Sequence, residues 1–226
     1  MGPQEPVLLA WSGGKDAAWA LHVLRQRGVE VVALLTTVNA DHDRVAMQGI
    51  RRDVLAAQAR AAGLPLLEAP ISSQCDNAAY EASFADALAR AQARWPRAGT
   101  VAFGDLYLSD IRAWREALCA RHGWRIHTPL FPADTAALAR TMLREGLVAH
   151  LTCVDTTQLD AAFAGHAFDD ALLDALPPGC DPCGENGEFH TLVSAGPMLA
   201  SPLQLVPGDR VLRDGRFMYA DFALAS

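Results

Sequence analysis

The residues at positions 12–16, in the order Ser-Gly-Gly-Lys-Asp, have the types that phosphate binding needs. The adjacent glycines Gly13 and Gly14 let the main chain approach an anion closely, and free backbone amides at the start of a helix attract phosphate. Lys15, the only lysine among 19 basic residues, adds a positive charge for phosphate oxygens. Asp16 is a candidate ligand for Mg²⁺. The segment predicts a phosphate-binding loop, with a plain strand-to-helix turn capped by Ser12 as the alternative.

A second group of candidates follows another apolar run. Gly104 and Asp105 end that run, and Arg112, Glu116 and Cys119 follow at the spacing i, i+4 and i+7. This spacing places the last three on one face of a helix. The alternative is an ordinary solvated ion pair between Arg112 and Glu116, beside a core cysteine.

A third group lies in residues 183–192. Two carboxylates, Glu185 and Glu188, each follow a glycine and precede His190 and Thr191. Such a segment can bring acidic groups to Mg²⁺ or to an amine nucleophile. An acidic surface turn that leads into an edge strand is the alternative.

Cys180 and Cys183 have C-x-x-C spacing, which leaves three interpretations open. They could be structural thiols, or part of a zinc site completed by Cys153 and His190. They could also serve redox or sulfur-transfer chemistry. The first interpretation is favoured, because the pair does not start a helix of a thioredoxin-like unit.

The elements that must position these groups alternate along the first 130 residues. Apolar runs predict strands over residues 6–11, 29–38, 64–71, 100–103 and 124–128, and helical spacing predicts helices over 15–27, 47–62, 76–95 and 109–122. Because the strands are apolar on both faces, the order predicts an α/β fold, a parallel Rossmann-like sheet between layers of helices. Ligands bind such sheets at the carboxyl ends of the strands, where the first two groups lie.

The alternation changes near residue 130. Helices over 134–145 and 169–176, a strand over 147–154 and a hairpin over 211–222 predict a smaller α+β domain. We therefore divide the chain into a ligand-binding domain over residues 1–130 and a substrate or acceptor domain over residues 131–226.

The composition excludes some classes of binding partner and indicates a cellular location. The net charge of −7 argues against nucleic acid, and no apolar run is long enough to cross a membrane. The first residues lack the basic and apolar regions of a secretory signal, and the five cysteines are an odd number. These features predict reduced thiols and a cytoplasmic location.

Residues 12–16 resemble the pyrophosphate loop, usually S-G-G-x-D-S, of the PP-loop ATPases, which have an adenine nucleotide α-hydrolase-like fold. Ala17 departs from the pattern at the final serine. Members of this group cleave ATP between the α and β phosphates. The resemblance implies an ATP site with Mg²⁺ at Asp16. Its expected ATP-binding residues are Ser12, Gly13, Gly14, Lys15 and Asp16, with Thr36 and Thr37 at the end of the second strand and Gly104 at the end of the fourth.

Within that group, the chain resembles the diphthine–ammonia ligase family. Residues 104–131 match its pattern G-D-[IL]…R…E…C…P-L-[WF], and residues 184–192 are similar to its G-E-G-G-E-[YF]-x-T-L element. Asn186 replaces a glycine of that element, and His190 stands where the family often has glutamate. The Met-Gln-Gly at 47–49 also resembles a family loop. The resemblance implies a ligase that adenylates a carboxylate, releases pyrophosphate and lets ammonia displace AMP.

The resemblance also implies roles for the candidate residues. The expected catalytic residues are Lys15, Asp16, Asp105, Glu185 and Glu188, and the expected substrate-binding residues are Arg112, Glu116, His190 and Thr191. The expected partners are ATP, ammonia or ammonium, and a carboxylate acceptor, either protein-borne or small. Two other functions stay open: a PP-loop enzyme that modifies tRNA or a small metabolite, and a non-catalytic adenine-nucleotide sensor, which Ala17 leaves room for. The oligomeric state, including a homo-oligomer, stays open as well.

Overall fold

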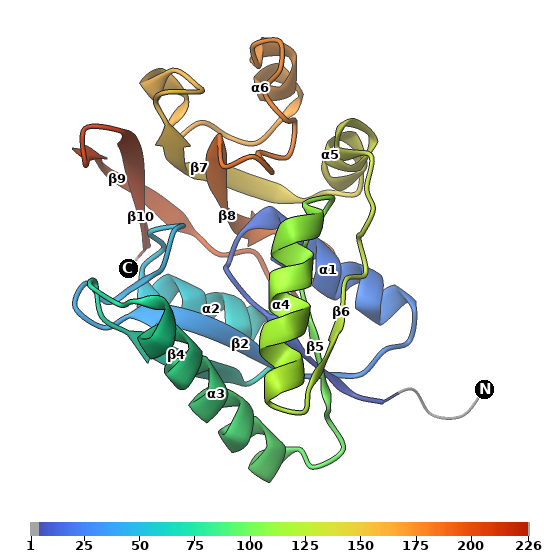
Figure 1. The fold of residues 1–226 in the computed structure, drawn as a ribbon. Helices are drawn as coiled ribbons and strands as arrows, with labels where there is room; N and C mark the ends of the chain where they lie inside the picture. Colours follow the sequence, from blue (N-terminus) through green and yellow to red (C-terminus); the bar gives the residue numbers. More distant parts are fainter. Residues whose placement is uncertain (1–4, 226) are drawn as a thin grey trace.

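The computed structural model describes residues 5–225 and contains two sheets (Figure 1). Four strands form a parallel run in the order β2-β1-β5-β6, and β4 pairs in parallel with the other side of β2. A two-residue strand, β3, pairs antiparallel with the end of β2. The bounds are β1 Val7–Ala10, β2 Val31–Asn39, β3 Arg44–Val45, β4 Leu66–Ile71, β5 Thr100–Ala102 and β6 Arg125–His127.

Helices cover both faces of this sheet, because its strands are apolar on both sides. Leu8 packs in a core cluster with α3 and α4, whereas its neighbour Leu9 packs in a second cluster with α1 and α2. This alternation along β1 is expected of a strand buried on both faces. The helices are α1 Lys15–Gln26, α2 Arg52–Ala62, α3 Asn77–Arg94 and α4 Ser109–Arg121. The α/β fold with a parallel, helix-covered sheet is therefore confirmed.

The second sheet is antiparallel, in the order β8-β7-β10-β9. Its outermost strands in this order are β8 and β9, and its side chains share a continuous core cluster with α1 and α2. The remaining bounds are α5 Thr135–Arg144, β7 Val148–Asp155, the 3₁₀ helix η1 Ala161–Phe163, α6 Asp170–Ala175, β8 Phe189–Ala195, β9 Leu205–Arg213 and β10 Phe217–Leu224. The predicted hairpin near the C-terminus is present, although β9 begins six residues earlier than residue 211.

The expected helix over residues 47–62 is wrong in its first part. Met47 and Gly49 have φ angles of 69° and 68°, which a right-handed helix excludes. Residues 46–49 instead form a turn after β3, and α2 starts only at Arg52. Within residues 5–225, no helix combines the length and the apolar character that crossing a bilayer requires.

Candidate active site

A cleft of about 530 Å³ lies at the carboxyl ends of the parallel strands and extends to the second sheet. Its walls come from the glycine-rich loop, the ends of β2 and β5, the start of α4, and residues 183–191. The structure thus brings together eleven of the residues that the sequence singles out: Ser12, Gly14, Lys15, Asp16, Thr36, Thr37, Gly104, Asp105, Glu185, His190 and Thr191. Four others, Gly13, Arg112, Glu116 and Glu188, are not part of its lining.

The glycine-rich loop closes directly onto β8. The backbone amide of Lys15 donates to the hydroxyl of Thr191 at 3.0 Å, and the amide of Gly14 donates to the Ser12 hydroxyl at 3.3 Å. Gly14 lies close against β8, because a Cβ there would be only 3.1 Å from the carbonyl oxygen of Thr191, and a larger residue would need a small shift of that strand. Thr191 therefore shapes the loop by accepting one of the free amides at the start of α1.

Gly13 has a positive φ of 80° and does not line the cleft, and its carbonyl oxygen is bonded within the protein. That oxygen accepts from the amide of Val193 at 3.0 Å and from the side-chain amide of Gln58 at 2.9 Å. Gln58 is fully buried, and it also accepts from the indole of Trp11 at 3.1 Å. Sequence reasoning missed Gln58, since a glutamine in a helix carries no signal of its partners.

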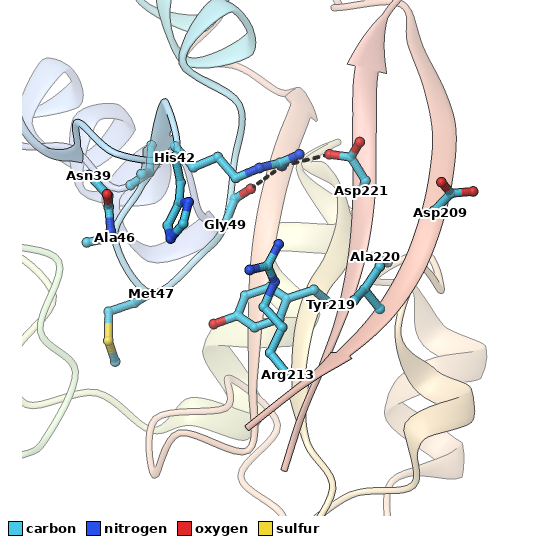
Figure 2. Close-up of a pocket in the computed structure, with 13 residues that line it drawn as sticks. Asn39, His42, Ala46, Met47, Gly49, Asp209, Arg213, Tyr219, Ala220 and Asp221 are labelled. Atoms are coloured by element: carbon cyan, nitrogen blue, oxygen red, sulfur yellow. Dashed lines mark hydrogen bonds and ion pairs between the residues drawn. The ribbon is translucent and has the colours of Figure 1, made fainter. Parts of the chain in front are cut away.

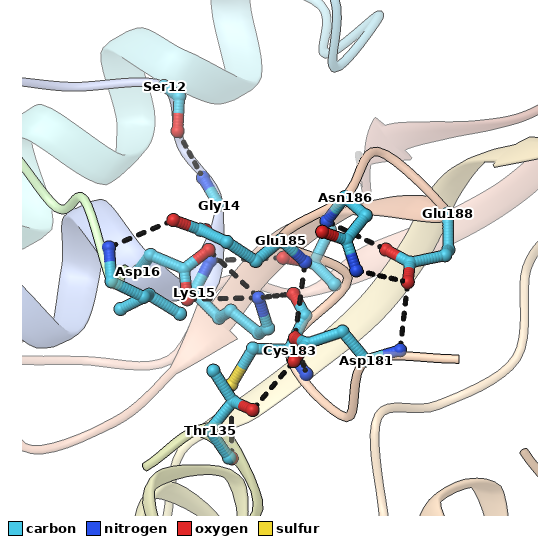
Figure 3. A network of polar contacts seen from close by, with 12 residues as sticks. Ser12, Gly14, Lys15, Asp16, Thr135, Asp181, Cys183, Glu185, Asn186 and Glu188 are labelled. Atoms are coloured by element: carbon cyan, nitrogen blue, oxygen red, sulfur yellow. Dashed lines mark hydrogen bonds and ion pairs between the residues drawn. The ribbon is translucent and has the colours of Figure 1, made fainter. Parts of the chain in front are cut away.

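Lys15 is almost completely buried, and its ammonium group is fully engaged within the protein (Figure 3). It lies 2.9 and 2.8 Å from the two carboxylate oxygens of Asp16, and it also donates to the carbonyl oxygen of Cys183. The rings of Phe168 and Phe189 lie 5.8 and 5.7 Å from it. Burial alone would lower the pKa of Lys15, but the Asp16 charge raises it above its usual value. Lys15 is thus a protonated link between the loop and residues 183–191.

Gly104 lets β5 pass close to the start of α1. A Cβ at this position would lie 2.8 Å from the carbonyl oxygen of Asp16, so only glycine fits without moving backbone. The next residue, Asp105, is buried and pairs with the guanidinium of Arg115 at 2.9 Å. Burial raises the pKa of Asp105, and the positive charge of Arg115 opposes that rise.

Two buried oxygen atoms of cleft residues have no hydrogen-bond partner within residues 5–225. They are the second carboxylate oxygen of Asp105 and the hydroxyl of Thr36. Leaving a buried polar atom unpaired costs about 1–3 kcal/mol, so such atoms usually have a ligand or water as partner. Their position at the ends of β5 and β2 marks this part of the cleft as a polar ligand subsite.

Glu185 connects residues 183–192 to the segment that follows β5. Its carboxylate accepts from the amides of Leu106 at 2.9 Å and Tyr107 at 3.3 Å. Burial raises the pKa of Glu185, and these two backbone hydrogen bonds oppose the rise. The carboxylate therefore holds the chain just after Asp105 in place at the edge of the cleft.

Glu188 points into its own turn rather than into the cleft (Figure 3). Its side chain is buried and accepts from the amides of Asp181 at 2.8 Å and Asn186 at 2.9 Å. The side-chain amide of Asn186 also donates to it, at 3.1 Å. The Glu188 carboxylate therefore orders residues 181–188, and the side chain of Asn186 adds one hydrogen bond to it.

His190 lines the cleft as a neutral group. Burial, with a smaller contribution from the Lys15 charge, lowers its pKa to about 4. At neutral pH the imidazole is therefore uncharged and can accept or donate one hydrogen bond per ring nitrogen.

Arg112 and Glu116 lie outside the cleft. Arg112 donates to the Thr128 hydroxyl at 3.2 Å and stacks 5.2 Å from the ring of Phe131, while Glu116 is exposed. The arginine that reaches the cleft is Arg115, which also stacks 4.5 Å from the ring of Phe103. The sequence spacing shows which residues of α4 share a face, but it does not show which face meets the sheet. It therefore did not distinguish Arg115 from Arg112.

The cysteines are free thiols in this structure. Burial raises the pKa of Cys180 to about 11 and that of Cys183 to about 12, which disfavours the reactive thiolate. Across residues 5–225, no three histidine, cysteine, aspartate or glutamate side chains are grouped so that they could hold a metal ion. This agrees with structural thiols and argues against the zinc alternative with Cys153 and His190.

The fold and the site define a class: an α/β protein with a parallel, helix-covered sheet and a ligand cleft at the carboxyl ends of its strands. Two family models match the chain, the diphthamide synthase N-terminal domain over residues 6–126 and the diphthamide synthase C-terminal domain over residues 134–219. The chain belongs to the diphthamide synthase family. The family resemblance that the three sequence motifs indicate is thereby confirmed.

Two individual similarities accompany the family match. The diphthine–ammonia ligase of Schizosaccharomyces pombe is 28% identical over 211 residues, which cover 86% of this chain. The chain spans only 35% of that relative's length. A solved structure described as a predicted subunit of tRNA methyltransferase from Methanocaldococcus jannaschii matches 85% of this chain and 98% of its own, with 16% identity and a TM-score of 0.44. At that TM-score the similarity says nothing about the function of this chain.

Proposed function

We propose that the protein is an ATP-dependent, AMP-forming ligase that adenylates a carboxylate and transfers ammonia to it. The observation that carries the proposal is the cleft itself. The glycine-rich loop, Asp105 after β5 and Glu185 in the turn before β8 all line this one cleft. The similarity to a diphthine–ammonia ligase supports the same reaction type and suggests diphthine, or a related carboxylate, as the acceptor.

The reaction needs a site that stabilises departing pyrophosphate. A carboxylate is a poor acyl donor because oxide would have to leave, whereas AMP is a good leaving group once the acyl adenylate has formed. The positive end of the α1 helix dipole, at the glycine-rich loop, suits the negative charge that grows on the outer phosphates. The Ser12 hydroxyl lies at the same point and supplies a further polar contact.

The unpaired oxygens of Thr36 and Asp105 suit the hydroxyl and amine donors of a nucleoside. A bound nucleotide that gave them partners would remove the cost of two buried, unpaired atoms. We therefore place the nucleoside between the ends of β2 and β5, and the phosphates over the loop. Thr37 and Gly104 line the same part of the cleft.

We assign positioning roles to three residues that the sequence alone suggests as catalytic. Lys15 holds Asp16 and the Cys183 carbonyl together, Glu185 holds the backbone after Asp105, and Glu188 orders the turn that carries Glu185. His190, neutral and at the cleft wall, is the candidate for contact with the uncharged ammonia nucleophile. A neutral imidazole nitrogen can accept a hydrogen bond from ammonia and so orient its lone pair toward the acyl carbon, and the proton that the nitrogen loses as the amide forms goes to solvent.

Mg²⁺ fits as an ion brought by the nucleotide rather than as a resident metal. Asp16 is the one carboxylate of the loop, and Mg²⁺ at phosphate sites needs only one or two carboxylates besides phosphate and water. The ion would neutralise charge on the phosphates. We also propose that residues 1–130 form the nucleotide-binding domain and that residues 131–226 form the acceptor domain.

Pyrophosphate exchange tests the function. Incubated with ATP, radiolabelled pyrophosphate and a panel of carboxylates that includes diphthine, the protein should form labelled ATP only with its own acceptor. With ammonia added, AMP and the amide should appear in equal amounts. Release of ADP in place of AMP would overturn the proposal.

The same assay separates the two alternatives. Tight ATP binding without exchange for any carboxylate would favour a nucleotide sensor, for which Ala17 is the motivating departure. Exchange that appears only with tRNA or with a small metabolite would favour a modifying enzyme of the same fold. The net charge of −7 weighs against tRNA.

A further inference from the structure

Strand β9 is an exposed edge of the second sheet. It lies at the end of the strand order, next to β10 alone, and eight of its nine residues are exposed (Figure 1). Three of the seven exposed large hydrophobic side chains of residues 5–225 belong to it: Val206 at 50%, Val211 at 46% and Leu212 at 50% exposed. Exposed edge strands with apolar side chains tend to pair with another chain.

The first half of β9 cannot pair well. Pro207 has no amide hydrogen to donate. A bulge follows it, because β9 has Gly208 and Asp209 where β10 has the single residue Asp221. Both features protect an edge against pairing. Residues 210–213 pair regularly with β10 and leave their other edge free, and Asp209, the second residue of the bulge, directly precedes them. Val211 is the centre of the five residues 209–213.

Charges are arranged symmetrically about that centre. Asp209, Val211 and Arg213 are alternate residues of β9, which share a face of a strand, and all three line one small cavity of about 170 Å³. Figure 2 labels Asp209 and Arg213 among the lining residues. Among residues 5–225, neither Asp209 nor Arg213 forms an ion pair, whereas nearby Asp221 is paired with Arg44 and Arg51. An acidic and a basic group thus stand at equal distances in sequence from Val211, without internal partners.

We propose that β9 pairs antiparallel with β9 of a second copy of this chain, about a twofold axis at Val211. In this register Val211 lies opposite Val211 of the other copy, and Asp209 of each copy lies opposite Arg213 of the other. Opposed residues of an antiparallel pair have Cβ atoms about 5 Å apart, so two ion pairs flank an apolar contact. On the other face, Leu212 lies against the aliphatic part of Arg210.

The pairing has a defined architecture. It joins the two antiparallel sheets into one, in the order β8-β7-β10-β9-β9-β10-β7-β8. Because opposed residues share a face, the small cavities of the two copies come to lie on the same face, beside the axis. A shift of the register by one residue would place Asp209 opposite Leu212 and leave both charges unpaired, so the charge pattern selects this register.

Sedimentation across a concentration series tests the interface. The wild-type chain should pass reversibly from the 24.2 kDa monomer to a species of twice that mass as concentration rises. Asp209→Arg and Arg213→Asp each place like charges opposite one another and should weaken the dimer about tenfold or more. The double variant Asp209→Arg/Arg213→Asp restores opposite charges and should recover the dimer. At a concentration low enough for all four proteins to be monomeric, they should have the same thermal unfolding temperature, because both positions are exposed.

A crosslink tests the register. Under mild oxidation Val211→Cys should form a covalent dimer on a non-reducing gel, since the two new thiols face each other across the axis. Leu212→Cys is the matched control and should not, because residue 212 faces residue 210. The wild type, with its five native thiols, sets the background. A chain that stays monomeric throughout, a dimer unaffected by the single charge reversals, or equal crosslinking at 211 and 212 would overturn the proposal.

Discussion

The backbone amide of Lys15 and the hydroxyl of Thr191 are joined by a 3.0 Å hydrogen bond across 176 residues of sequence. Thr191 lies on β8 of the antiparallel sheet, and Lys15 begins the first helix of the parallel sheet. The carbonyl of Thr191 also abuts Gly14. The conformation of the glycine-rich loop is therefore set partly by the second sheet, and not by the loop alone.

Thr191→Val should destabilise the protein and weaken ATP binding. Valine keeps the shape of the side chain but leaves the Lys15 amide without its acceptor, which costs about 1–3 kcal/mol in the free energy of unfolding. Thr191→Ser, which keeps the hydroxyl, should lose less than half as much. Urea unfolding checks stability, and the ATP dependence of pyrophosphate exchange checks the loop. Equal behaviour of the valine and serine variants would contradict the proposed role of the hydroxyl.

Lys15→Met should lower the free energy of unfolding of the protein even when no nucleotide is present. It removes the positive charge from the Asp16 carboxylate, whose side chain is only 29% exposed, at a cost of about 3 kcal/mol in the free energy of unfolding. Because the cost comes from the unpaired carboxylate, Lys15→Met/Asp16→Asn should recover most of the lost stability. Thermal unfolding of the three variants measures this.

The two possible roles of Lys15 give different outcomes in that comparison. A lysine that served mainly as a phosphate ligand would raise the KM for ATP without changing the unfolding temperature, and the second substitution would restore nothing. A lysine that links the loop to residue 183 changes the unfolding temperature even when no nucleotide is present.

Glu185→Ala should reduce exchange activity by about a hundredfold while leaving the fold intact. The change frees the amides of Leu106 and Tyr107, so that Asp105 is no longer held at its place, and a misplacement of about 1 Å can cost that much. Glu185→Gln keeps a carbonyl acceptor and should retain most of the activity. If the glutamine variant were as inactive as the alanine variant, the negative charge itself would be needed, and Glu185 would have a direct catalytic role.

Sequence patterns predicted the parallel sheet because burial on both faces is visible in the residue types. Leu8 and Leu9 are adjacent and apolar, and they do face opposite cores. The turn at residues 46–49 was not predictable in this way. Helical spacing continues through it, but the positive φ angles of Met47, a residue that seldom adopts one, and of Gly49 keep the helix from starting before Arg52.

The location of the cleft was predictable, but the directions of its side chains were not. Glu185 and Glu188 look equivalent in sequence, yet the first reaches residues 106 and 107 and the second folds back onto its own turn. One partner of the Lys15 ammonium group, the carbonyl oxygen of Cys183, is a backbone atom 168 residues away. Contacts of that kind depend on how two sheets pack, and local spacing does not encode them.

His190 should make stability depend on pH in the weakly acidic range. Its pKa is about 4 in the native protein, against 6.5 ordinarily, so between these values the unfolded chain binds more protons than the folded one. The free energy of unfolding therefore falls as pH drops from about 6.5 toward 4, and it gains nothing further from this group above 6.5.

The free energy of unfolding, obtained from urea unfolding, should fall between about pH 7.5 and about pH 4.5. In His190→Gln this fall should be smaller by about 2 kcal/mol than in the wild type. Part of the slope should persist, because burial also lowers the pKa of His127 and His150. The exposed His122→Gln is the matched control for the histidine-to-glutamine substitution itself. The comparison concerns the slope rather than absolute stability, so a general destabilisation by glutamine does not obscure it. An unchanged slope in His190→Gln would mean that the pKa of this imidazole is the same in the folded and unfolded chains, which would contradict the lowering of its pKa by burial.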